Sequence, residues 1–264
     1  MNHTTACLVI PPLTILYRDT WLIAIAKPSG LLVHRSLIDK HETRFALQML
    51  RDQIGQRVYP VHRLDKPTSG VLLFTLDEES ARCMGEQFEH NAVLKRYLAV
   101  VRGYTSDEGT IDYALREEQD RLTDGRARQN KPSQPAITDY QRLATLEIPV
   151  SDGRHPTSRY SLLTIQPRTG RKHQIRRHMK HIFHPIIGDT THGDGRHNRL
   201  FLEQLNCRRL LLAAQELHFT HPYSGARISI RSPLDEQFQR VLEAFEWQAG
   251  DMEDDADSRT QTTQ

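Results

Sequence analysis

The stretch with the clearest chemical potential is YPVHRLDKPTSGVLLFTL, residues 59–76. It places one carboxylate, Asp65, between two cations, Arg63 and Lys66, and closes the group with Pro67 before an apolar run. A surface turn needs no such crowding of charge, although Asp65 could simply cap a turn before a strand. A site that keeps a carboxylate ionised and brings a polyanion to it does need nearby cations, because these favour the charged form of the acid.

Positive charge is concentrated in two further segments. Residues 166–184, QPRTGRKHQIRRHMKHIFH, contain six arginines and lysines, four histidines and no acidic residue. Residues 121–131, RLTDGRARQNK, contain four basic residues, among them Arg126 and Arg128, and one acidic residue. A solvated face usually alternates its charges, so these runs favour a surface that binds phosphates. From Glu246 onward six acidic residues accompany one basic residue, which leaves an excess of seven positive charges in the preceding chain.

The four histidines within residues 166–184 raise the question of a zinc site. Their spacing matches neither the H-E-x-x-H pattern nor any pattern of cysteine and histidine ligands, and no acid lies among them. We therefore expect no metal, and we expect these histidines to act as neutral partners of phosphates or backbone groups. Because the chain also lacks a P-loop and a G-x-G-x-x-G motif, no organic cofactor is expected.

The composition is that of a soluble, globular protein. The chain has 264 residues, 38% of them hydrophobic, and no apolar run approaches the ~18–20 residues of a membrane span. The first residues show no secretory signal, and three isolated cysteines fit no disulfide framework. These features predict a reduced, cytoplasmic location. We expect a short N-terminal extension over 1–12, one domain over 13–248 and a disordered acidic tail over 249–264.

The apolar periodicity predicts an α+β fold with mostly β signals. In the basic run a helix is expected to begin at Thr169–Gly170. Its core-facing residues are expected to be Ile175, Met179, Ile182 and Phe183. Three other helices are predicted, at 43–55, 77–91 and 234–247. Residues 151–158 are predicted as a loop. Strands are predicted as a pair within 13–28 and at 70–76, 93–103, 109–114, 136–146, 158–166, 209–219 and 226–231.

Several of these segments together resemble the RluA-type pseudouridine synthases. HRLDKPTSGVLLF (62–74), KRYLAVVRG (95–103) and TGRKHQIRRHM (169–179) followed by HPIIGD (184–189) are similar to the family's three motif regions. LIAIAKPSGLLVH (22–34) is similar to the segment that precedes the family's aspartate motif. Segments this long and in this order are specific. The resemblance implies a mixed, mostly antiparallel β-sheet flanked by helices and loops, without an S4-like domain.

The resemblance also implies a reaction and residues that carry it. The family isomerises uridine in RNA by breaking the N1–C1′ bond, rotating the uracil and joining C5 to C1′. Asp65 corresponds to the catalytic aspartate, which either stabilises or attacks C1′ or removes the C2′ proton. Arg176 corresponds to the basic residue paired with that aspartate. Tyr97 corresponds to the tyrosine that stacks on the target base and assists deprotonation at C5.

The remaining basic residues are expected to contact RNA. The target uridine must leave its stack, at a cost of roughly a few kcal/mol, and Arg63 is expected to enter the vacated space or stack on neighbouring bases. Lys66, Arg171 and Lys172 are expected to bind phosphates. The other residues expected at the RNA surface are His173, Arg177, Arg126 and Arg128.

The resemblance favours tRNA as the partner, in its acceptor-stem region, because the length and the lack of an S4-like domain match tRNA-modifying members. Alternatives are a synthase acting on 23S ribosomal RNA, an RNA-binding protein or chaperone without chemistry, and a glycosylase that releases the base. No membrane or protein partner is implied.

Overall fold

The computed structural model of the protein describes residues 11–35, 42–116, 132–151 and 153–248. The predicted acidic tail, most of the predicted N-terminal extension, and both Arg126 and Arg128 lie outside these ranges. The expectations about them stay predictions. No helix in the described ranges is long and apolar enough to cross a membrane.

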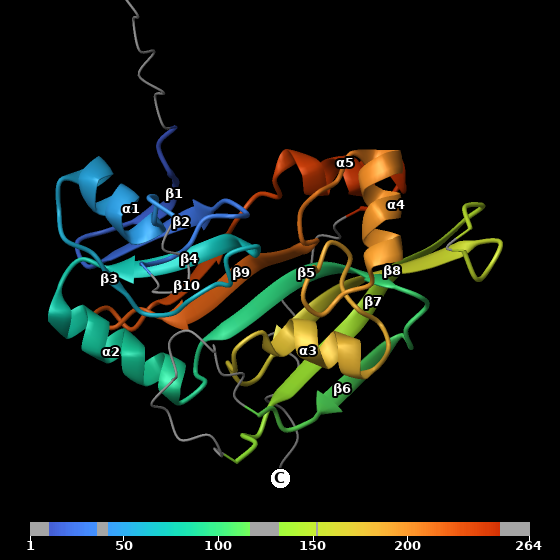
Figure 1. Ribbon diagram of the computed structural model, residues 1–264. Helices are drawn as coiled ribbons and strands as arrows, with labels where there is room; N and C mark the ends of the chain where they lie inside the picture. Colours follow the sequence, from blue (N-terminus) through green and yellow to red (C-terminus); the bar gives the residue numbers. More distant parts are fainter. Residues whose placement is uncertain (1–10, 36–41, 117–131, 152, 249–264) are drawn as a thin grey trace, which may run out of the picture.

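One mixed sheet forms the centre of the fold (Figure 1). Within the described ranges it has ten strands in the order β1-β2-β4-β9-β5-β8-β7-β6, with β3 paired to β4 and β10 to β9. All these pairs are antiparallel except β4–β9, which confirms the expected α+β fold. The strands are β1 (Thr14–Arg18), β2 (Leu22–Lys27), β3 (Tyr59–Pro60), β4 (Ser69–Thr75), β5 (Leu94–Arg102), β6 (Glu108–Asp112), β7 (Ile137–Ile148), β8 (Ser158–Pro167), β9 (Leu212–Thr220) and β10 (Arg227–Arg231).

Five helices within the described ranges cover the sheet. Helix α1 packs Leu50 against one face of β2 and β4, whereas α2 packs Met84 against the other face. Strand β4 is therefore buried along its whole length, as expected of a continuous apolar run. The helices are α1 (Ala46–Ile54), α2 (Glu78–Glu89), α3 (Gln174–His181), α4 (Gly195–Leu205) and α5 (Glu236–Ala244).

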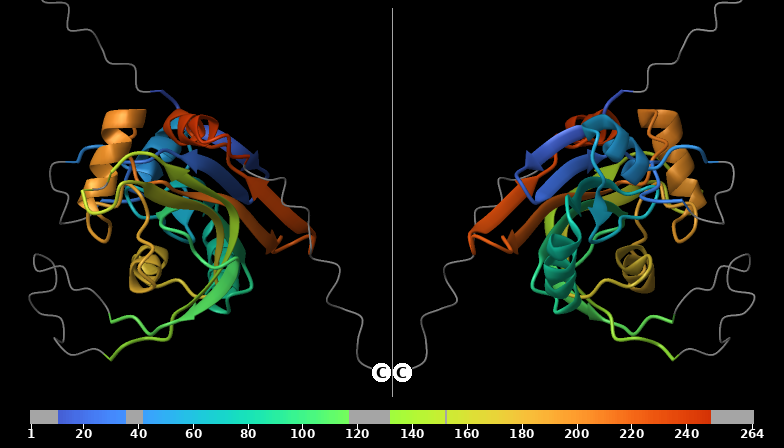
Figure 2. Two further views of the ribbon diagram at one scale, coloured as in Figure 1. Left: turned by 90° about the vertical axis from the view of Figure 1, so that its right-hand side faces the viewer. Right: turned by 90° about the vertical axis from the view of Figure 1, so that its left-hand side faces the viewer.

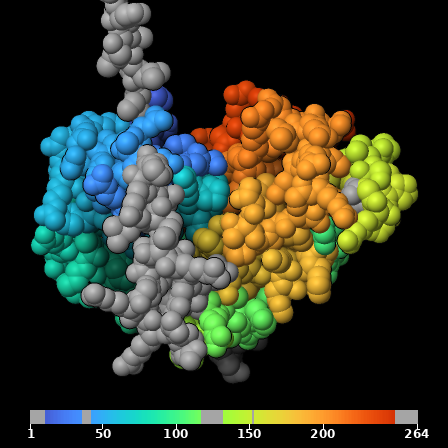
Figure 3. All heavy atoms as spheres, viewed as in Figure 1, coloured from blue at the N-terminus to red at the C-terminus, as the bar shows by residue number. Residues whose placement is uncertain are grey.

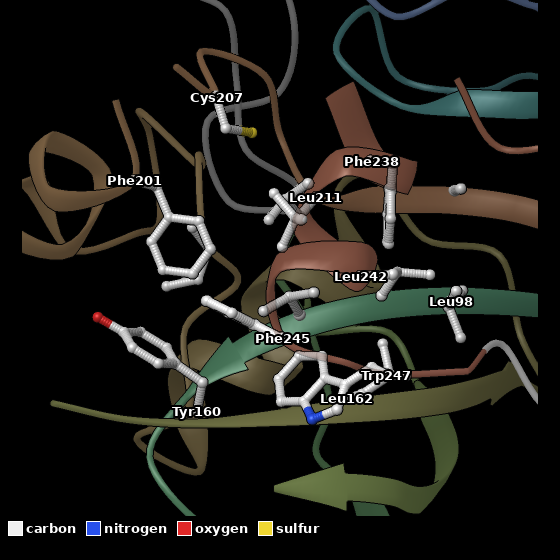
Figure 4. Packing of buried hydrophobic residues seen from close by; sticks show 14 of the residues in the cluster. Leu98, Tyr160, Leu162, Phe201, Cys207, Leu211, Phe238, Leu242, Phe245 and Trp247 are labelled. Carbon is white, nitrogen blue, oxygen red and sulfur yellow. The ribbon is translucent and has the colours of Figure 1, made fainter. Parts of the chain in front are cut away.

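The second half of the sheet is covered in the same two-sided way. On one face α4 and α5 pack aromatic side chains, among them Phe201 and Phe238, against Leu98 of β5 and Leu162 of β8 (Figure 4). On the other face α3 packs Ile175 among residues of β5 and β8. Figure 2 shows the sheet curving around α3, so that this helix lies on the concave side.

Strand β9 joins the two halves of the sheet, because it lies between β4 and β5. Its contact with β4 is short and parallel, pairing Ser69 with Ala213 and Gly70 with Ala214. Gly70 has φ 115°, and a Cβ atom there would lie 2.0 Å from the carbonyl oxygen of Ala214. A glycine is required here, since any side chain would push β4 away from β9.

Helix α3 differs from the expectation at both ends. It begins at Gln174 rather than at Thr169–Gly170, because the Gln174 side chain accepts hydrogen bonds from the Thr169 hydroxyl (2.7 Å) and the Arg171 N–H (2.9 Å) and holds the preceding residues as a loop. It ends at His181, and Phe183 is 80% exposed. The expectation that Phe183 faces the core was therefore wrong, whereas Ile175 and Met179 are buried.

Candidate active site

The loop between β3 and β4 carries Asp65, and the segment after β2 supports it. The N–H of Gly30 donates to the carbonyl of Lys66 at 2.8 Å, and the Ser29 hydroxyl donates to the carbonyl of Pro67 at 2.8 Å. Within the loop, the N–H of Thr68 donates to the carbonyl of Asp65 at 3.0 Å. These bonds explain why the 22–34 segment accompanies the aspartate motif: Ser29 and Gly30 fix the loop.

Lys27, the last residue of β2, also supports this loop. Its side chain is 1% exposed, and Nζ donates to the carbonyls of Pro28 (2.9 Å), Leu31 (2.7 Å) and Lys66 (3.1 Å). Burial lowers the pKa of Lys27 to about 7, with a further lowering from the charge of Arg209 and an opposing effect from Asp65. This lysine was quoted within the 22–34 segment but was assigned no role from the sequence.

Arg176 of α3 contacts the Asp65 carboxylate itself. Its Nη1 donates to Asp65 Oδ2 at 3.1 Å, while Nε and Nη2 form a two-pronged pair with the oxygens of Asp189 at 2.7 and 2.8 Å. Arg176 is 4% exposed. Burial opposes its charge, but the two carboxylates raise the pKa of Arg176 above its usual value. The guanidinium is therefore a fixed cation between two anions.

Asp189, at the end of the HPIIGD motif, is held more firmly than an ordinary ion-pair partner. Burial alone would raise the pKa of Asp189, but hydrogen bonds from Arg176 and from the N–H groups of His192 and Thr191 hold it below its usual value. From α4, the Asn198 amide donates to the carbonyl of Asp189 at 2.9 Å. The motif was recognised in the sequence, but this carboxylate was not singled out.

A cleft of about 660 Å³ opens in front of Asp65, and Tyr97 of β5 lines it. Burial raises the pKa of the Tyr97 hydroxyl well above its usual value, and the charge of Asp65 adds to this. The phenol is therefore protonated at neutral pH. Figure 3, viewed as Figure 1, shows the blue-to-teal residues of the first part of the chain on the left and the yellow-to-orange residues of its later part on the right.

His173 lies immediately before α3 and also faces Asp65. Its backbone has φ 54°, and its Nε2 is 4.0 Å from Asp65 Oδ2. On the other side of the ring, Nδ1 lies 3.0 Å from Nε2 of His192, which is buried. The imidazole was expected to contact RNA, and the structure places it beside the carboxylate in the lining of the cleft.

Three of the cations expected at the RNA surface also line the cleft: Arg63, Arg171 and Lys172. All three are exposed. Lys66 is not among the lining residues, and its ammonium pairs with Glu42 at 2.9 Å.

Arg177 is partly exposed and is likewise not among the residues that line the cleft. Arg126 and Arg128 lie outside the described residues. The structure thus brings Asp65, Tyr97, Arg176, His173, Arg63, Arg171 and Lys172 together in one cleft, and the RNA-binding roles stay predictions.

Histidines elsewhere in the basic run bond to backbone groups. His178 is buried, with Nε2 3.0 Å from the carbonyl of Tyr113, and Nδ1 of His184 lies 2.8 Å from the carbonyl of Arg102. Across the part of the chain that the structure describes, no three His, Cys, Asp or Glu side chains are grouped to hold a metal ion.

The sequence model of the RNA pseudouridylate synthase family matches residues 21–181. The chain therefore belongs to this family of enzymes. It is 56% identical over 235 residues to tRNA pseudouridine synthase C of Haemophilus ducreyi, a match that covers 89% of this chain and 96% of the relative. The protein of the same name from Vibrio vulnificus is 53% identical over 235 residues, with the same coverage.

Two solved human structures share the fold. Human RNA Pseudouridylate Synthase Domain Containing 4 superposes with a TM-score of 0.66 at 27% identity, covering 88% of this chain and 93% of that one. Human RNA Pseudouridylate Synthase Domain Containing 1 gives a TM-score of 0.63 at 25% identity, covering 89% and 94%. The mixed sheet and its helices are thus those of a pseudouridine synthase domain.

Proposed function

We propose that the protein converts a uridine in the acceptor-stem region of tRNA to pseudouridine, and that Asp65 is its catalytic aspartate. The observation that carries the proposal is the Asp65 carboxylate, which faces the cleft and receives the Arg176 hydrogen bond at 3.1 Å. The relatives named tRNA pseudouridine synthase C, at 56% and 53% identity over most of the chain, support tRNA as the substrate.

The charges around Asp65 suit the breaking of a glycosidic bond. Arg176 is already neutralised by its pair with Asp189, so Asp65 leaves the three groups with a net charge of one negative. Breaking the N1–C1′ bond develops positive charge at C1′, which a nearby carboxylate stabilises or attacks. Removal of the C2′ proton by Asp65 would need the same ionised group. In either route Arg176 orients the carboxylate through its hydrogen bond.

The cleft offers the detached uracil a place to turn. Its volume of about 660 Å³ lies within the range of roughly 300–1,000 Å³ typical of ligand pockets. Tyr97 gives an aromatic face on which the base can stack before and after rotation. Because its hydroxyl is protonated, Tyr97 can also donate a hydrogen bond to an oxygen of the anionic uracil.

Arg63 is the residue proposed to hold the substrate open. It is exposed and lines the cleft two positions before Asp65. A flipped uridine leaves a gap in the helix, and a planar guanidinium can stack on the bases beside it. Arg171 and Lys172 line the same cleft, where they can bind the phosphates of the same strand.

The test is tritium release from uridine labelled at C5, measured separately with tRNA and with ribosomal RNA. We expect release from tRNA by the wild-type protein, and none by Asp65→Asn, which should still bind tRNA within about tenfold of the wild-type affinity. More than a few percent of the wild-type activity in Asp65→Asn would assign the chemistry to another residue. Release from ribosomal RNA alone would contradict the proposed substrate, and free uracil in solution would indicate a glycosylase instead.

A further inference from the structure

Lys95 lines the cleft as a partly buried cation without an anion. It lies on β5 two residues before Tyr97. Within the part of the chain that the structure describes, its ammonium has neither a hydrogen-bond acceptor nor a carboxylate partner. Burial lowers the pKa of Lys95, and no neighbouring carboxylate offsets that effect. Lys95 is the first residue of the KRYLAVVRG motif, and the motif alone predicts no role for it.

The next residue of the strand shows that this arrangement is specific to Lys95. Arg96 points to the other face of β5, where its Nη1 lies 3.3 Å from Oε2 of Glu216. Glu216 is buried and also pairs with Arg231 at 2.7 Å. The fold thus supplies a carboxylate for the cation that faces away from the cleft and none for the cation that faces into it.

His62 lies close enough to Lys95 for the charge of the lysine to affect its pKa. His62 stacks on Phe88 with ring centres 4.8 Å apart, and its Nε2 accepts the N–H of Leu73 at 3.0 Å. Burial lowers the pKa of His62 to about 3, and the charge of Lys95 lowers it further, so this imidazole is neutral. Asn91, which follows α2, lines the same cleft.

A partly desolvated ammonium without a partner is costly, and an anion that binds there removes the cost. Alternate residues of a strand lie ~6.6–6.8 Å apart on one face, so Lys95 is about that far along the wall from Tyr97. If the target base stacks on Tyr97, the sugar-phosphate backbone of the RNA strand that carries this base would run beside β5. We propose that Lys95 binds a phosphate of the RNA strand beside the flipped uridine, with the Asn91 amide as a second donor. This inference rests on the proposed function.

The test compares the salt dependence of tRNA binding, in a full-length Asp65→Asn background that prevents turnover. Lys95→Met should weaken binding about tenfold, the equivalent of one charge-assisted hydrogen bond. It should also reduce the slope of log affinity against log salt by ~0.7–0.9, as expected for one lost phosphate contact. Lys95→Arg should keep most of the slope.

The matched control is Arg227→Met, which removes one positive charge from an exposed position on β10, outside the cleft lining. We expect its slope to equal that of the background protein. Thermal unfolding will check that the variants fold, and Lys95→Gln will replace Lys95→Met if the latter does not.

Two results would overturn the inference. Unchanged affinity and slope in Lys95→Met would mean that no anion binds there. Weaker binding with an unchanged slope would assign Lys95 to a base or sugar rather than to a phosphate. If either accompanies normal tritium release by the wild-type protein, the proposed function stands and only this inference fails. Absence of release by the wild type would instead remove the proposed function.

Discussion

Two buried cations contact the Asp65 loop, and they are held by different kinds of atom. Arg176 is 4% exposed and contacts two carboxylates, whereas Lys27 is 1% exposed and contacts three carbonyl oxygens. The pKa of Arg176 is raised by its partners, and the pKa of Lys27 falls to about 7 through burial. The guanidinium of Arg176 stays charged at any accessible pH, and its two carboxylates reinforce that charge, whereas burial lets the ammonium of Lys27 titrate near neutral pH. The cation that touches Asp65 is the one held by carboxylates.

Among the variants that test this comparison, Asp189→Asn should have the largest effect. Arg176 would then have only Asp65 as a counter-charge, and its position would no longer be fixed by the two-pronged pair. We expect kcat to fall about 100-fold, the size of effect produced by a displacement of about 1 Å in a catalytic group. Because Asp189 does not line the cleft, KM for tRNA should change little.

Asp194→Asn is the matched control for that variant. Asp194 caps α4 and pairs with Arg102 at 2.6 Å, away from Asp65. The Asp194→Asn substitution should lower the free energy of unfolding while leaving kcat near the wild-type value. An Asp189→Asn protein with wild-type kcat would show that Asp65 alone positions Arg176. A fall in kcat of equal size in both variants would mean that the effect is general destabilisation.

Lys27 gives a smaller effect, which appears in the pH dependence of stability. Its pKa is about 7 in the folded protein and ~10.4 in an unfolded chain. Between these values the unfolded state binds more protons, so the free energy of unfolding should rise with pH, by up to about 1.4 kcal/mol per unit. Lys27→Met should remove this rise, and denaturant unfolding from pH 7 to 10 measures it.

The absolute stability of Lys27→Met should be lower at every pH, because three carbonyls lose their donor. The informative quantity is therefore the slope. Lys180→Met, which removes an exposed lysine, should keep the wild-type slope. If Lys27→Met also keeps it, Lys27 is charged throughout this range, and carbonyl partners hold a buried cation as well as carboxylates do.

The smallest effect is expected from Lys66, the cation next to Asp65 in the sequence. Its pair with Glu42 at 2.9 Å is exposed to solvent, with 37% and 42% of the two side chains accessible. Lys66→Met should change the free energy of unfolding by less than about 1 kcal/mol, since exposed ion pairs contribute little. A loss of several kcal/mol in denaturant unfolding would contradict the distinction between exposed and buried cations.

Local pattern was enough to predict much of the fold. The apolar runs of β2 and β4 and the helical spacing of α1, α2 and α5 each identify an element, because burial of one face dictates the residue types. Helix α4 has no counterpart among the elements expected from the sequence, although Asp194 caps its start and Asn206, in the left-handed region, follows its end. The late start of α3 depends on the Gln174 side chain, which no periodicity reveals.

The site divides in the same way. The motifs predicted that Asp65 and Arg176 pair, and the structure places them 3.1 Å apart. Three other features depend on which distant segments meet: the pair of Asp189 with Arg176, the His173–His192 contact, and the position of Lys95 in the cleft without a carboxylate among the described residues. Such contacts are set by tertiary packing rather than by residue spacing, so the sequence offered the residue types without their partners.

The position of β9 in the sheet has a consequence for the order in which the site forms during synthesis. Asp65 belongs to the part of the sheet built by β1, β2 and β4, and Tyr97 belongs to the part built by β5 to β8. Only β9, residues 212–220, lies between them. A nascent chain emerges from its N-terminus, so β9 must leave the ribosome before the two parts of the sheet can join and bring Asp65 near Tyr97. The cleft is therefore assembled only after β9 has been synthesised.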